Sequence, residues 1–505
     1  MRDLLTEEPR TPRFVKVLDQ TRCIGCHACT TACKSENLVP LGVTRTYVKA
    51  VEVGTFPQVR RSFQVTRCNQ CEDAPCVAAC PTGAMYRRPD GIVDFNKSVC
   101  IGCKACMAAC PYDAIFINPH DHSAEKCNFC SHRIDQGLEP ACVVVCPVEA
   151  ILVGDLNDPS SRVSELVNRG PVTVRRPEKE TRPKVFYKGA HQATLDPIAA
   201  HRPDGGLFMW SEQPQVPHGV ISGHPGGWNS SAAALLAYDV AHRAPWDWRV
   251  SLYTWTKGIS AGVYLVAAVL ALAGALAWSA SVWLWAAPLI ALGMLAATGA
   301  VLIADLEHPE RFYMIFTRSQ WRSWLVRGAF AIGGYGGVLT LHLLGSIIGV
   351  RGLQEWLTIA GIPLAAATAG YTAYLFAQAK ARDLWQSPLL PPHMLVQSVL
   401  LGAAVLLPFG QATHDLRWIL GGAALTHVLM VLGEITLTHP TAHAHLAVKE
   451  MTRRRYAVPF WLGLVLVAVA VAAPWIGVVA IAPALLGVLC HEHAFVQSGQ
   501  SVPLA

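Results

Sequence analysis

The chain has 505 residues, of which 52% are hydrophobic and only 15% are charged, and its formal net charge is +6 at pH 7. Charged residues make up about a quarter of an average soluble protein, so this composition, with its positive mean hydropathy, excludes a chain that is water-soluble throughout. Residues 1–154 are rich in cysteine, residues 155–245 in proline, glycine and charge, and residues 246–505 are almost continuously apolar. We therefore expect a multidomain protein with a soluble domain, a linker and a membrane domain, in that order.

Cysteine is the most informative residue type in the first region. Sixteen of the 17 cysteines fall into four sets of four: Cys23, Cys26, Cys29, Cys33; Cys68, Cys71, Cys76, Cys80; Cys100, Cys103, Cys106, Cys110; and Cys127, Cys130, Cys142, Cys146. The third set has the spacing C-x2-C-x2-C-x3-C followed by Pro111, and the first has the same spacing with Lys34 in place of proline. Such a run supplies three thiolates to one [4Fe–4S] cluster and a fourth to the other cluster of a pair. The sequence therefore predicts four [4Fe–4S] clusters in two pairs, with these sixteen cysteines as iron ligands.

Two other uses of cysteine explain the pattern less well. Structural zinc sites also use C-x2-C pairs, but they rarely add a third cysteine three residues later and a final Cys-Pro. Disulfides need an oxidising compartment and would not account for the repeated spacing. The iron–sulfur interpretation is therefore favoured.

The cysteine-rich region also repeats itself. The segment CIGCHACTTAC, which begins at Cys23, recurs as CIGCKACMAAC at Cys100. A short apolar stretch follows each of the prolines Pro81, Pro111 and Pro147. We expect an α+β double-ferredoxin domain over residues 1–154, in which a short strand leaves each of these three loops.

Residues 155–245 carry few candidate functional groups and are predicted to be an extended linker that wraps a partner subunit. Within them, residues 231–242 are predicted to form a short surface helix. Trp246 and Trp248 stand beside Arg243 and Arg249, a combination typical of an anchor at the membrane interface.

The apolar region divides into eight segments of roughly the ~20 residues that a bilayer core requires. They are Val250–Ala277, Val282–Ala304, Trp324–Val350, Trp356–Ala379, His393–Phe409, Leu416–Leu437, Pro459–Ala473 and Ile476–Phe495, of which the seventh is the shortest. Eight such runs separated by short loops argue against buried helices of a soluble protein. We expect an all-α bundle of eight transmembrane helices, with both chain ends on the same side of the membrane as the cysteine-rich domain.

The charges of the loops predict which side that is. Nine basic residues lie in loops on the side of the cysteine-rich domain, Arg311, Arg318, Arg322, Lys380, Arg382, Lys449, Arg453, Arg454 and Arg455, against Arg351 and Arg417 on the opposite side. Basic residues favour the cytoplasmic side, so we expect the cysteine-rich domain in the cytoplasm. No apolar or twin-arginine stretch precedes Cys23, which gives the same expectation. The alternative is that these basic loops bind an acidic partner subunit.

Two stretches of the chain resemble known families. Residues 10–160 resemble the four-cluster electron-transfer subunit of complex iron–sulfur molybdoenzymes, through CNQCEDAPCVAACP (Cys68–Pro81) and KCNFCSHRIDQGLEPACVVVCP (Lys126–Pro147). Residues 250–505 resemble the NrfD/polysulfide-reductase membrane subunit, through DLEHPERFY (Asp305–Tyr313), SWLVRGAF (Ser323–Phe330) and the C-terminal QSGQSVPL. These subunits are usually separate polypeptides, so the chain resembles a fusion of the two. The resemblance implies nested cluster pairing, in which the second and third runs share one pair and the first and fourth share the other.

A chain of clusters needs a source and a sink of electrons. The sequence has no Rossmann fingerprint and no obvious histidine pair for a haem, so we expect the sink to be a quinone, menaquinone or ubiquinone, held by the membrane domain. The expected source is a separate catalytic subunit with a molybdenum or tungsten pterin. Membrane lipid is a further expected partner, and nucleic acid is not. The alternative is a self-contained ferredoxin:quinone oxidoreductase, with or without coupling to proton translocation.

Ionisable residues inside membrane spans are costly and mark candidate functional sites. The candidates for a quinone site are Lys257, Asp305, His308, Arg311 and Glu434, and Arg327, His393 and Glu492 are expected at the same cluster-facing end of the bundle. Such groups could donate hydrogen bonds to a quinone and supply the two protons that its reduction consumes. The alternative is that the basic side chains extend to lipid headgroups and that Asp305 caps a helix or pairs with Arg311.

A second polar set is expected deeper in the bundle. His427 lies seven residues before Glu434 on the same face of its helix, His342 lies in the third span, and Tyr371 and Tyr374 lie in the fourth. These residues could form a proton path across the bilayer. We favour the interpretation that they are hydrogen-bonded core residues that pack the helices together.

Overall fold

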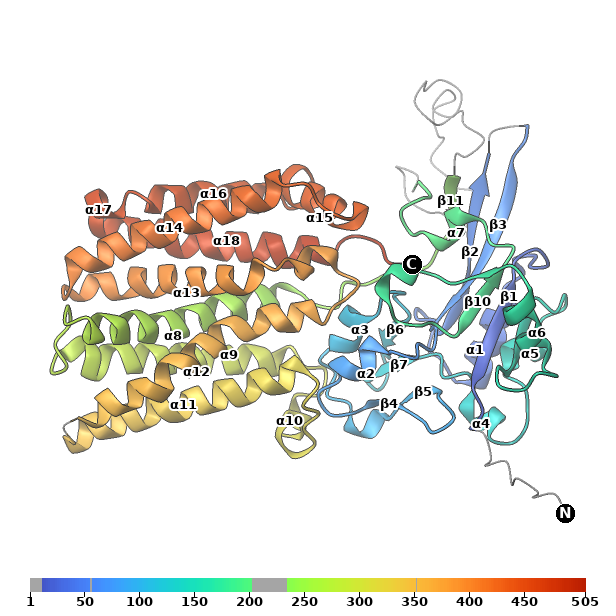
Figure 1. Cartoon of the computed structure of the whole chain (residues 1–505), viewed down its shortest axis with the longest axis horizontal. Helices are drawn as coiled ribbons and strands as arrows, with labels where there is room; N and C mark the ends of the chain where they lie inside the picture. Colours follow the sequence, from blue (N-terminus) through green and yellow to red (C-terminus); the bar gives the residue numbers. More distant parts are fainter. Residues whose placement is uncertain (1–10, 55–56, 202–233, 351) are drawn as a thin grey trace, which may run out of the picture.

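The computed structural model describes residues 11–54, 57–201, 234–350 and 352–505. Figure 1 shows two parts, with the strands of the cysteine-rich domain gathered at one end of the molecule and the long helices at the other. The order of a small α/β domain followed by a helical membrane domain agrees with the prediction.

Short strands and short helices make up the cysteine-rich domain. They are β1 (Phe14–Asp19), α1 (Ala28–Glu36), β2 (Thr46–Val53), β3 (Arg60–Arg67), α2 (Pro75–Ala79), β4 (Met85–Arg87), β5 (Val93–Phe95), α3 (Ala105–Ala109), β6 (Ile115–Ile117), β7 (Ala124–Lys126), α4 (Ser131–Ile134), α5 (Ala141–Val144), β8 (Ile151–Asp155), α6 (Arg162–Arg169), β9 (Val172–Thr173), β10 (Val185–Lys188), α7 (Gln192–Leu195) and β11 (Ala234–Tyr238). The strands β4, β6 and β8 follow the three Cys-Pro pairs, as predicted.

Part of the predicted linker belongs to the fold of this domain. One sheet has the strand order β8-β1-β10-β9, and β10 runs parallel to β1. Both faces of β1 are buried, with Val15 and Val17 fully inaccessible, so its backbone groups need a neighbour on each edge. Strand β10 supplies the second neighbour and buries Val185 and Tyr187 completely. Residues 155–201 are therefore integrated into the domain, and residues 202–233 of the predicted linker lie outside the described residues.

The predicted surface helix at residues 231–242 is wrong where the structure describes it. Residues Ala234–Tyr238 form β11, which pairs antiparallel with β2 in the sheet β11-β2-β3. Alanine and leucine favour a helix in isolation, but pairing with the edge of β2 satisfies the backbone and buries Leu236 against Val51 and Val53.

The membrane domain consists of long apolar helices joined by short connections. They are α8 (Trp248–Leu272), α9 (Ala287–Ala304), α10 (Met314–Thr317), α11 (Trp324–Ile348), α12 (Leu353–Ala377), α13 (Leu390–Leu406), α14 (Thr413–Thr436), α15 (Ala442–Arg453), α16 (Ala457–Ala470), α17 (Ala473–Ile476) and α18 (Ile481–Gly499). Among the described residues, seven helical segments are long and apolar enough to cross a membrane, and α16 is shorter, with 14 residues.

The C-terminal tail supports an even number of membrane crossings. Gln500 donates a hydrogen bond to the carbonyl of Trp246, two residues before α8, so the two ends of the membrane domain meet. Arg382 fixes the tail by donating to the carbonyls of Gln500 and Val502, both at 3.0 Å. With seven long helices, the short α16 would supply the remaining crossing. The count of eight stays a prediction, and this contact supports it.

Helix α8 is the centre of the bundle, because 83% of its most apolar stretch is buried, against 28% for α9, α11 and α14. It packs on α9, α12, α13 and α18. Its approach to α13 is close enough to require glycine on both sides. A Cβ atom on Gly262 would lie 1.7 Å from the carbonyl oxygen of Ser398, and one on Gly402 would lie 2.1 Å from the backbone of Gly262.

His242, which follows β11, contacts Asp113, which lies just after the third cysteine run. The imidazole of His242 lies 2.5 Å from a carboxylate oxygen of Asp113 and 3.1 Å from one of Asp239. Burial acts against the charged imidazole, but hydrogen bonds to Asp113 and Asp239 outweigh it and raise the pKa of His242 to about 9.

This pKa predicts a pH-dependent contribution to stability. Because the pKa of His242 is higher in the folded than in the unfolded protein, protonation of His242 stabilises the fold. This stabilisation is complete below pH 6.5, the pKa in the unfolded protein, and is lost as the pH rises through about 9. We expect His242→Asn to lower the free energy of unfolding of the domain by about 2 kcal/mol at pH 6, after allowance for the partial exposure of the side chain. Guanidinium unfolding of both proteins from pH 6 to 10 measures the difference, which should shrink above pH 9. A difference independent of pH would contradict this role.

Candidate functional site

The structure gathers the sixteen cysteines into four groups, and each group takes members from two runs. Three cavities are lined by Cys23, Cys26, Cys29 and Cys146; by Cys68, Cys71, Cys76 and Cys110; and by Cys80, Cys100, Cys103 and Cys106. In the fourth group, Cys33 interacts electrostatically with Cys127, Cys130 and Cys142. This is the nested pairing that the resemblance implies. The last cysteine of each run joins the group of another run, with the first run paired with the fourth and the second with the third.

The repeated sequence explains why the loops curl around their thiols. Gly25 and Gly102 occupy equivalent places in the two CIGC segments, with φ of 70° and 69°. His27 and Lys104, two residues later, are also equivalent, and both have φ of 61°. These left-handed positions turn the loop tightly, so that three cysteines of one run face the same cavity.

Backbone N–H groups point at several of the sulfur atoms. Met85 donates to Cys80 Sγ at 3.3 Å, Ala124 to Cys100 Sγ at 3.4 Å, and Ala150 to Cys146 Sγ at 3.2 Å. Hydrogen bonds of this kind stabilise negative charge on sulfur and tune the potential of a bound cluster.

The electrostatics of the cavities fit a metal cluster. Burial, with a contribution from Cys68, raises the pKa of Cys71 to about 12. Four converging thiolates therefore need a cationic centre, which the irons of a cluster would supply. All four members of each group offer free thiols, and no disulfide links the cysteines, all of which lie within the described residues. The donor set fits [4Fe–4S] clusters.

Cys142 differs from the other thiols. Burial acts to raise its pKa, but Lys16 and Arg67 outweigh it and lower the pKa of Cys142 to about 7. The Nη1 atom of Arg67 lies 3.1 Å from Cys142 Sγ, and both cations are almost completely buried. Two buried positive charges beside one sulfur favour the more negative state of whatever that sulfur binds.

The group formed by Cys80, Cys100, Cys103 and Cys106 lies against the membrane domain. Trp246 Nε1 donates to the carbonyl of Cys103 at 3.2 Å, and Gln320 Nε2 donates to the carbonyl of Cys80 at 2.8 Å. A Cβ atom on Gly102 would lie 2.4 Å from Cβ of Glu307, so the loop and the segment after α9 are in close contact.

Three of the predicted quinone-site residues make this contact. Arg311 donates to the carbonyls of Lys97 and Cys100, both at 3.0 Å. The Nε2 atom of His308 lies 2.8 Å from the carbonyl oxygen of Asp121, and Asp305 lies 3.5 Å from Lys104 Nζ. Burial raises the pKa of Asp305 to about 6, although Lys104 acts to lower it. The sequence analysis assigned Asp305, His308 and Arg311 to a quinone site. In the structure, their contacts join the membrane domain to the cysteine-rich domain.

Lys257 occupies a different place, a small polar cavity inside the bundle. Its ammonium group is buried and donates to the carbonyl of Ala369 at 2.9 Å and to Thr372 Oγ1 at 2.6 Å. Thr254, Gln397, Ser398 and Glu492 also line the cavity. Glu492 is 4% exposed, and its Oε2 atom has no hydrogen-bond partner among the described residues.

The structure separates the remaining candidates. Glu434 lies near the end of α14 and is not among the residues that line the Lys257 cavity. Thr254, Gln397 and Ser398 were not predicted, because neutral polar residues in a span are too common to signal a site. Of the deeper set, His342 binds the carbonyl of Trp283 at 3.0 Å, which agrees with a packing role. His427 instead meets His393 and His491, a cluster that the sequence did not predict because the three residues lie on separate helices.

Comparisons with known proteins match both parts of the chain. Residues 59–156 match the 4Fe-4S dicluster domain family, and residues 238–502 match the family described as polysulphide reductase, NrfD. The sequence is 42% identical to one subunit of the tetrathionate reductase of Salmonella typhimurium over 194 residues, which is 37% of this chain and 76% of that protein. It is 38% identical to the arsenate respiratory reductase iron-sulfur subunit ArrB of Shewanella sp. (35% of this chain, 95% of that protein), and 42% identical to one polypeptide of the polysulfide reductase of Wolinella succinogenes (34% and 93%).

The sharing of cysteines between runs can be tested by removing single thiols. Cys80 and Cys71 belong to one run in the sequence, but Cys80 shares a cavity with Cys103. We expect Cys80→Ala and Cys103→Ala to lose the same electron paramagnetic resonance signal of the reduced protein, and Cys71→Ala to lose a different one. Iron content, measured in parallel, should fall to a similar extent in all three variants. Matching spectra for Cys80→Ala and Cys71→Ala would contradict the grouping.

Proposed function

Because the protein belongs to the NrfD family of polysulphide reductases, we propose that it is the electron-transfer and quinone-reactive subunit of a multi-subunit molybdenum or tungsten oxidoreductase. Its cysteine-rich domain is similar to an iron-sulfur subunit of an arsenate respiratory reductase and to one polypeptide each of a tetrathionate and a polysulfide reductase. Four [4Fe–4S] clusters, when bound to the sixteen cysteines, supply one-electron carriers between a catalytic partner and the membrane.

One observation carries the proposal: the cysteine group that contains Cys103 is docked on the helix that bears Lys257. Trp246, which donates a hydrogen bond to the carbonyl of Cys103, lies two residues before the start of α8. Lys257 follows nine residues after the first residue of that helix, which corresponds to a depth of about 14 Å at the ~1.5 Å rise per residue. The polar cavity therefore lies below the cysteine group nearest the membrane, where an electron acceptor in the bilayer would be reduced.

The residues of the Lys257 cavity fit the headgroup of a menaquinone or ubiquinone. Reduction of a quinone takes two electrons and two protons and gives a quinol. Lys257 is positioned to donate a hydrogen bond to one quinone oxygen, because it has three N–H groups and two protein acceptors. Glu492 has an oxygen without a partner among the described residues and can hold a proton for the second oxygen. Burial among protein rather than lipid keeps both groups in place.

The catalytic partner is proposed to bind at the end of the domain that lies away from the membrane. The group of Cys23, Cys26, Cys29 and Cys146 contains an exposed thiol, Cys26. Apolar side chains close to this group in the sequence are also exposed. Ile24, next to Cys23, is 56% exposed, and Val144, two residues before Cys146, is 62% exposed. Exposed apolar side chains beside a redox group suit contact with another subunit. The same residues serve electron flow in either direction.

The cysteine-rich domain is proposed to face the cytoplasm. Arg311 and Arg382 take part in contacts within the protein, so they are weaker indicators of orientation. The other seven basic residues on this side still outnumber Arg417 on the opposite side, and Arg351 lies outside the described residues.

Labelling of single introduced cysteines tests the orientation. His414, which is highly exposed, lies at the end of the bundle away from the cysteine-rich domain, and Lys380 lies on the side of that domain. With a membrane-impermeant maleimide on intact spheroplasts, we expect His414→Cys to react and Lys380→Cys to react only after permeabilisation. The opposite result would place the cysteine-rich domain outside the cytoplasm.

Substitution of Lys257 tests the quinone site. In Lys257→Gln we expect the oxidation of chemically reduced clusters by a short-chain quinone to slow on the order of 100-fold, because the long amine donor to the headgroup is replaced by a shorter amide. Stopped-flow absorbance of the clusters measures the rate. Iron content and the spectra of the reduced clusters should be unchanged.

Lys380→Gln is the matched control, because it removes an exposed lysine from the same end of the bundle and should keep the wild-type rate. Glu492→Gln should slow the reaction and weaken its dependence on pH, because it removes the proposed proton donor. Wild-type rates in Lys257→Gln would show that the quinone binds elsewhere.

A further inference from the structure

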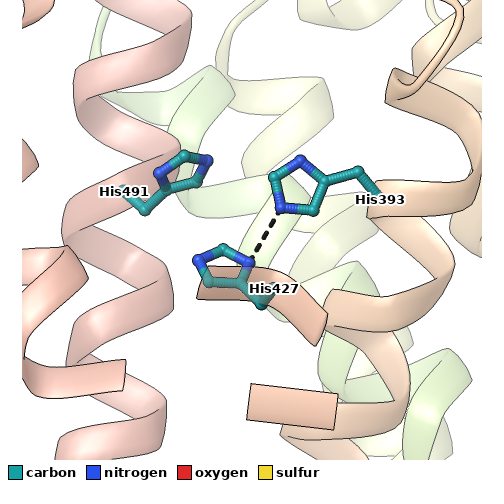
Figure 2. A group of neighbouring side chains, drawn as sticks. All are labelled: His393, His427 and His491. Carbon is teal, nitrogen blue, oxygen red and sulfur yellow. Dashed lines mark hydrogen bonds between the residues drawn. The ribbon is translucent and has the colours of Figure 1, made fainter. Parts of the chain in front are cut away.

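Three histidines from three helices meet inside the membrane domain, and none of them lines the Lys257 cavity. His393 lies on α13, His427 on α14 and His491 on α18. The three side chains are almost fully buried, at 4%, 0% and 2% exposure. Figure 2 shows the imidazole rings turned toward one another, with a hydrogen bond between His393 and His427.

Hydrogen bonding within the protein leaves this cluster incomplete. The bond between His393 Nε2 and His427 Nδ1 is 2.9 Å long, but the other nitrogen of His427, Nε2, has no partner among the described residues. The Nδ1 atom of His491 also has none within the same part of the chain. Buried polar atoms normally have a hydrogen-bond partner, so the cluster leaves two ring nitrogens free to bind a ligand.

The geometry and the donor type fit a metal ion. One nitrogen from each ring can be chosen so that the three lie within 4.8 Å of one another. Ligands of a tetrahedral ion with bonds of about 2.0–2.1 Å lie roughly 3.4 Å apart, so rotations that move the rings by about 1 Å would complete the site. Facing helices of a bundle are common positions for such sites.

We propose that His393, His427 and His491 bind one late first-row transition-metal ion, copper or zinc. Neutral imidazoles favour these ions over magnesium or calcium, which prefer oxygen ligands. The bound ion would connect α13, α14 and α18. Phe460 and Phe495, whose rings lie 6.3 Å and 6.1 Å from that of His491, close one side of the site with apolar surface.

The test is the metal content of the full-length protein, purified in mild detergent, incubated with ZnSO4 or with copper under reducing conditions, and dialysed. Mass spectrometry of the elements should find about one added ion per chain in the wild type and at least tenfold less in His427→Asn. His493→Asn is the matched control, because His493 lies on the same helix as His491, only partly buried and outside the cluster, and it should keep the ion.

Two further measurements make the outcome decisive. Iron content, equal in all three proteins, shows that the variants are folded and that the cluster cysteines are not the binding site. X-ray absorption at the zinc or copper edge should show nitrogen ligands at about 2.0 Å rather than sulfur at about 2.3 Å. An added ion that His427→Asn retains, sulfur ligation, or a wild type that binds no ion would overturn the proposal, and the last result would leave a hydrogen-bonded imidazole cluster.

Discussion

The organisation of the cysteine-rich domain depends on the convergence of four thiols from two separate runs on each cavity. Cys80 joins the cavity of the third run, and Cys110 returns to that of the second, so neither loop can complete its site alone. The same exchange links the first and fourth runs, which lie more than 90 residues apart. Because each site forms only when two runs come together, the free energy of iron binding would also stabilise the folded domain.

The arrangement of the two domains follows from the way the cysteine loops present their backbone. Short loops around a cluster leave many carbonyl groups outside regular strands and helices, and these groups need donors when they are buried. The membrane domain supplies the donors through Arg311, Trp246 and Gln320. The C-terminal tail strengthens the same interface, since Arg175 of the cysteine-rich domain donates to the carbonyl of Leu504. A cysteine group is thereby held directly above α8, the most buried helix of the bundle.

The features that were predictable from the sequence are those set by local pattern. The spacing of cysteines identifies iron–sulfur loops, and long apolar runs identify membrane helices, because both signals lie within about 20 residues. The sequence pattern does not show which other run shares the fourth cysteine of a given run, because this depends on tertiary structure. Only the family resemblance implied that pairing. Strand β10 was missed because proline and charge surround it, and β11 was predicted as a helix because its partner β2 is distant in sequence.

In the candidate sites, too, only residues with a local sequence signal were predictable. Lys257 was identified because a lysine inside a span is rare, whereas its neutral neighbours Gln397 and Ser398 gave no signal. His308 and Arg311 were correctly expected at the cluster-facing end, but only the structure shows that their hydrogen bonds go to the cysteine-rich domain. The cluster of His393, His427 and His491 arises from the packing of helices α13, α14 and α18, which no local pattern reports.

The proposed role of the protein is to relay electrons between a catalytic partner subunit and a quinone. The most direct test is anaerobic purification from its native membranes in mild detergent, with identification of every accompanying chain and analysis of metals. We expect a large pterin-binding subunit with stoichiometric molybdenum or tungsten, and about sixteen irons on this chain. A protein that purifies alone with the same iron content, and that reduces quinone with electrons from soluble ferredoxin, would contradict the claim and indicate a self-contained ferredoxin:quinone oxidoreductase.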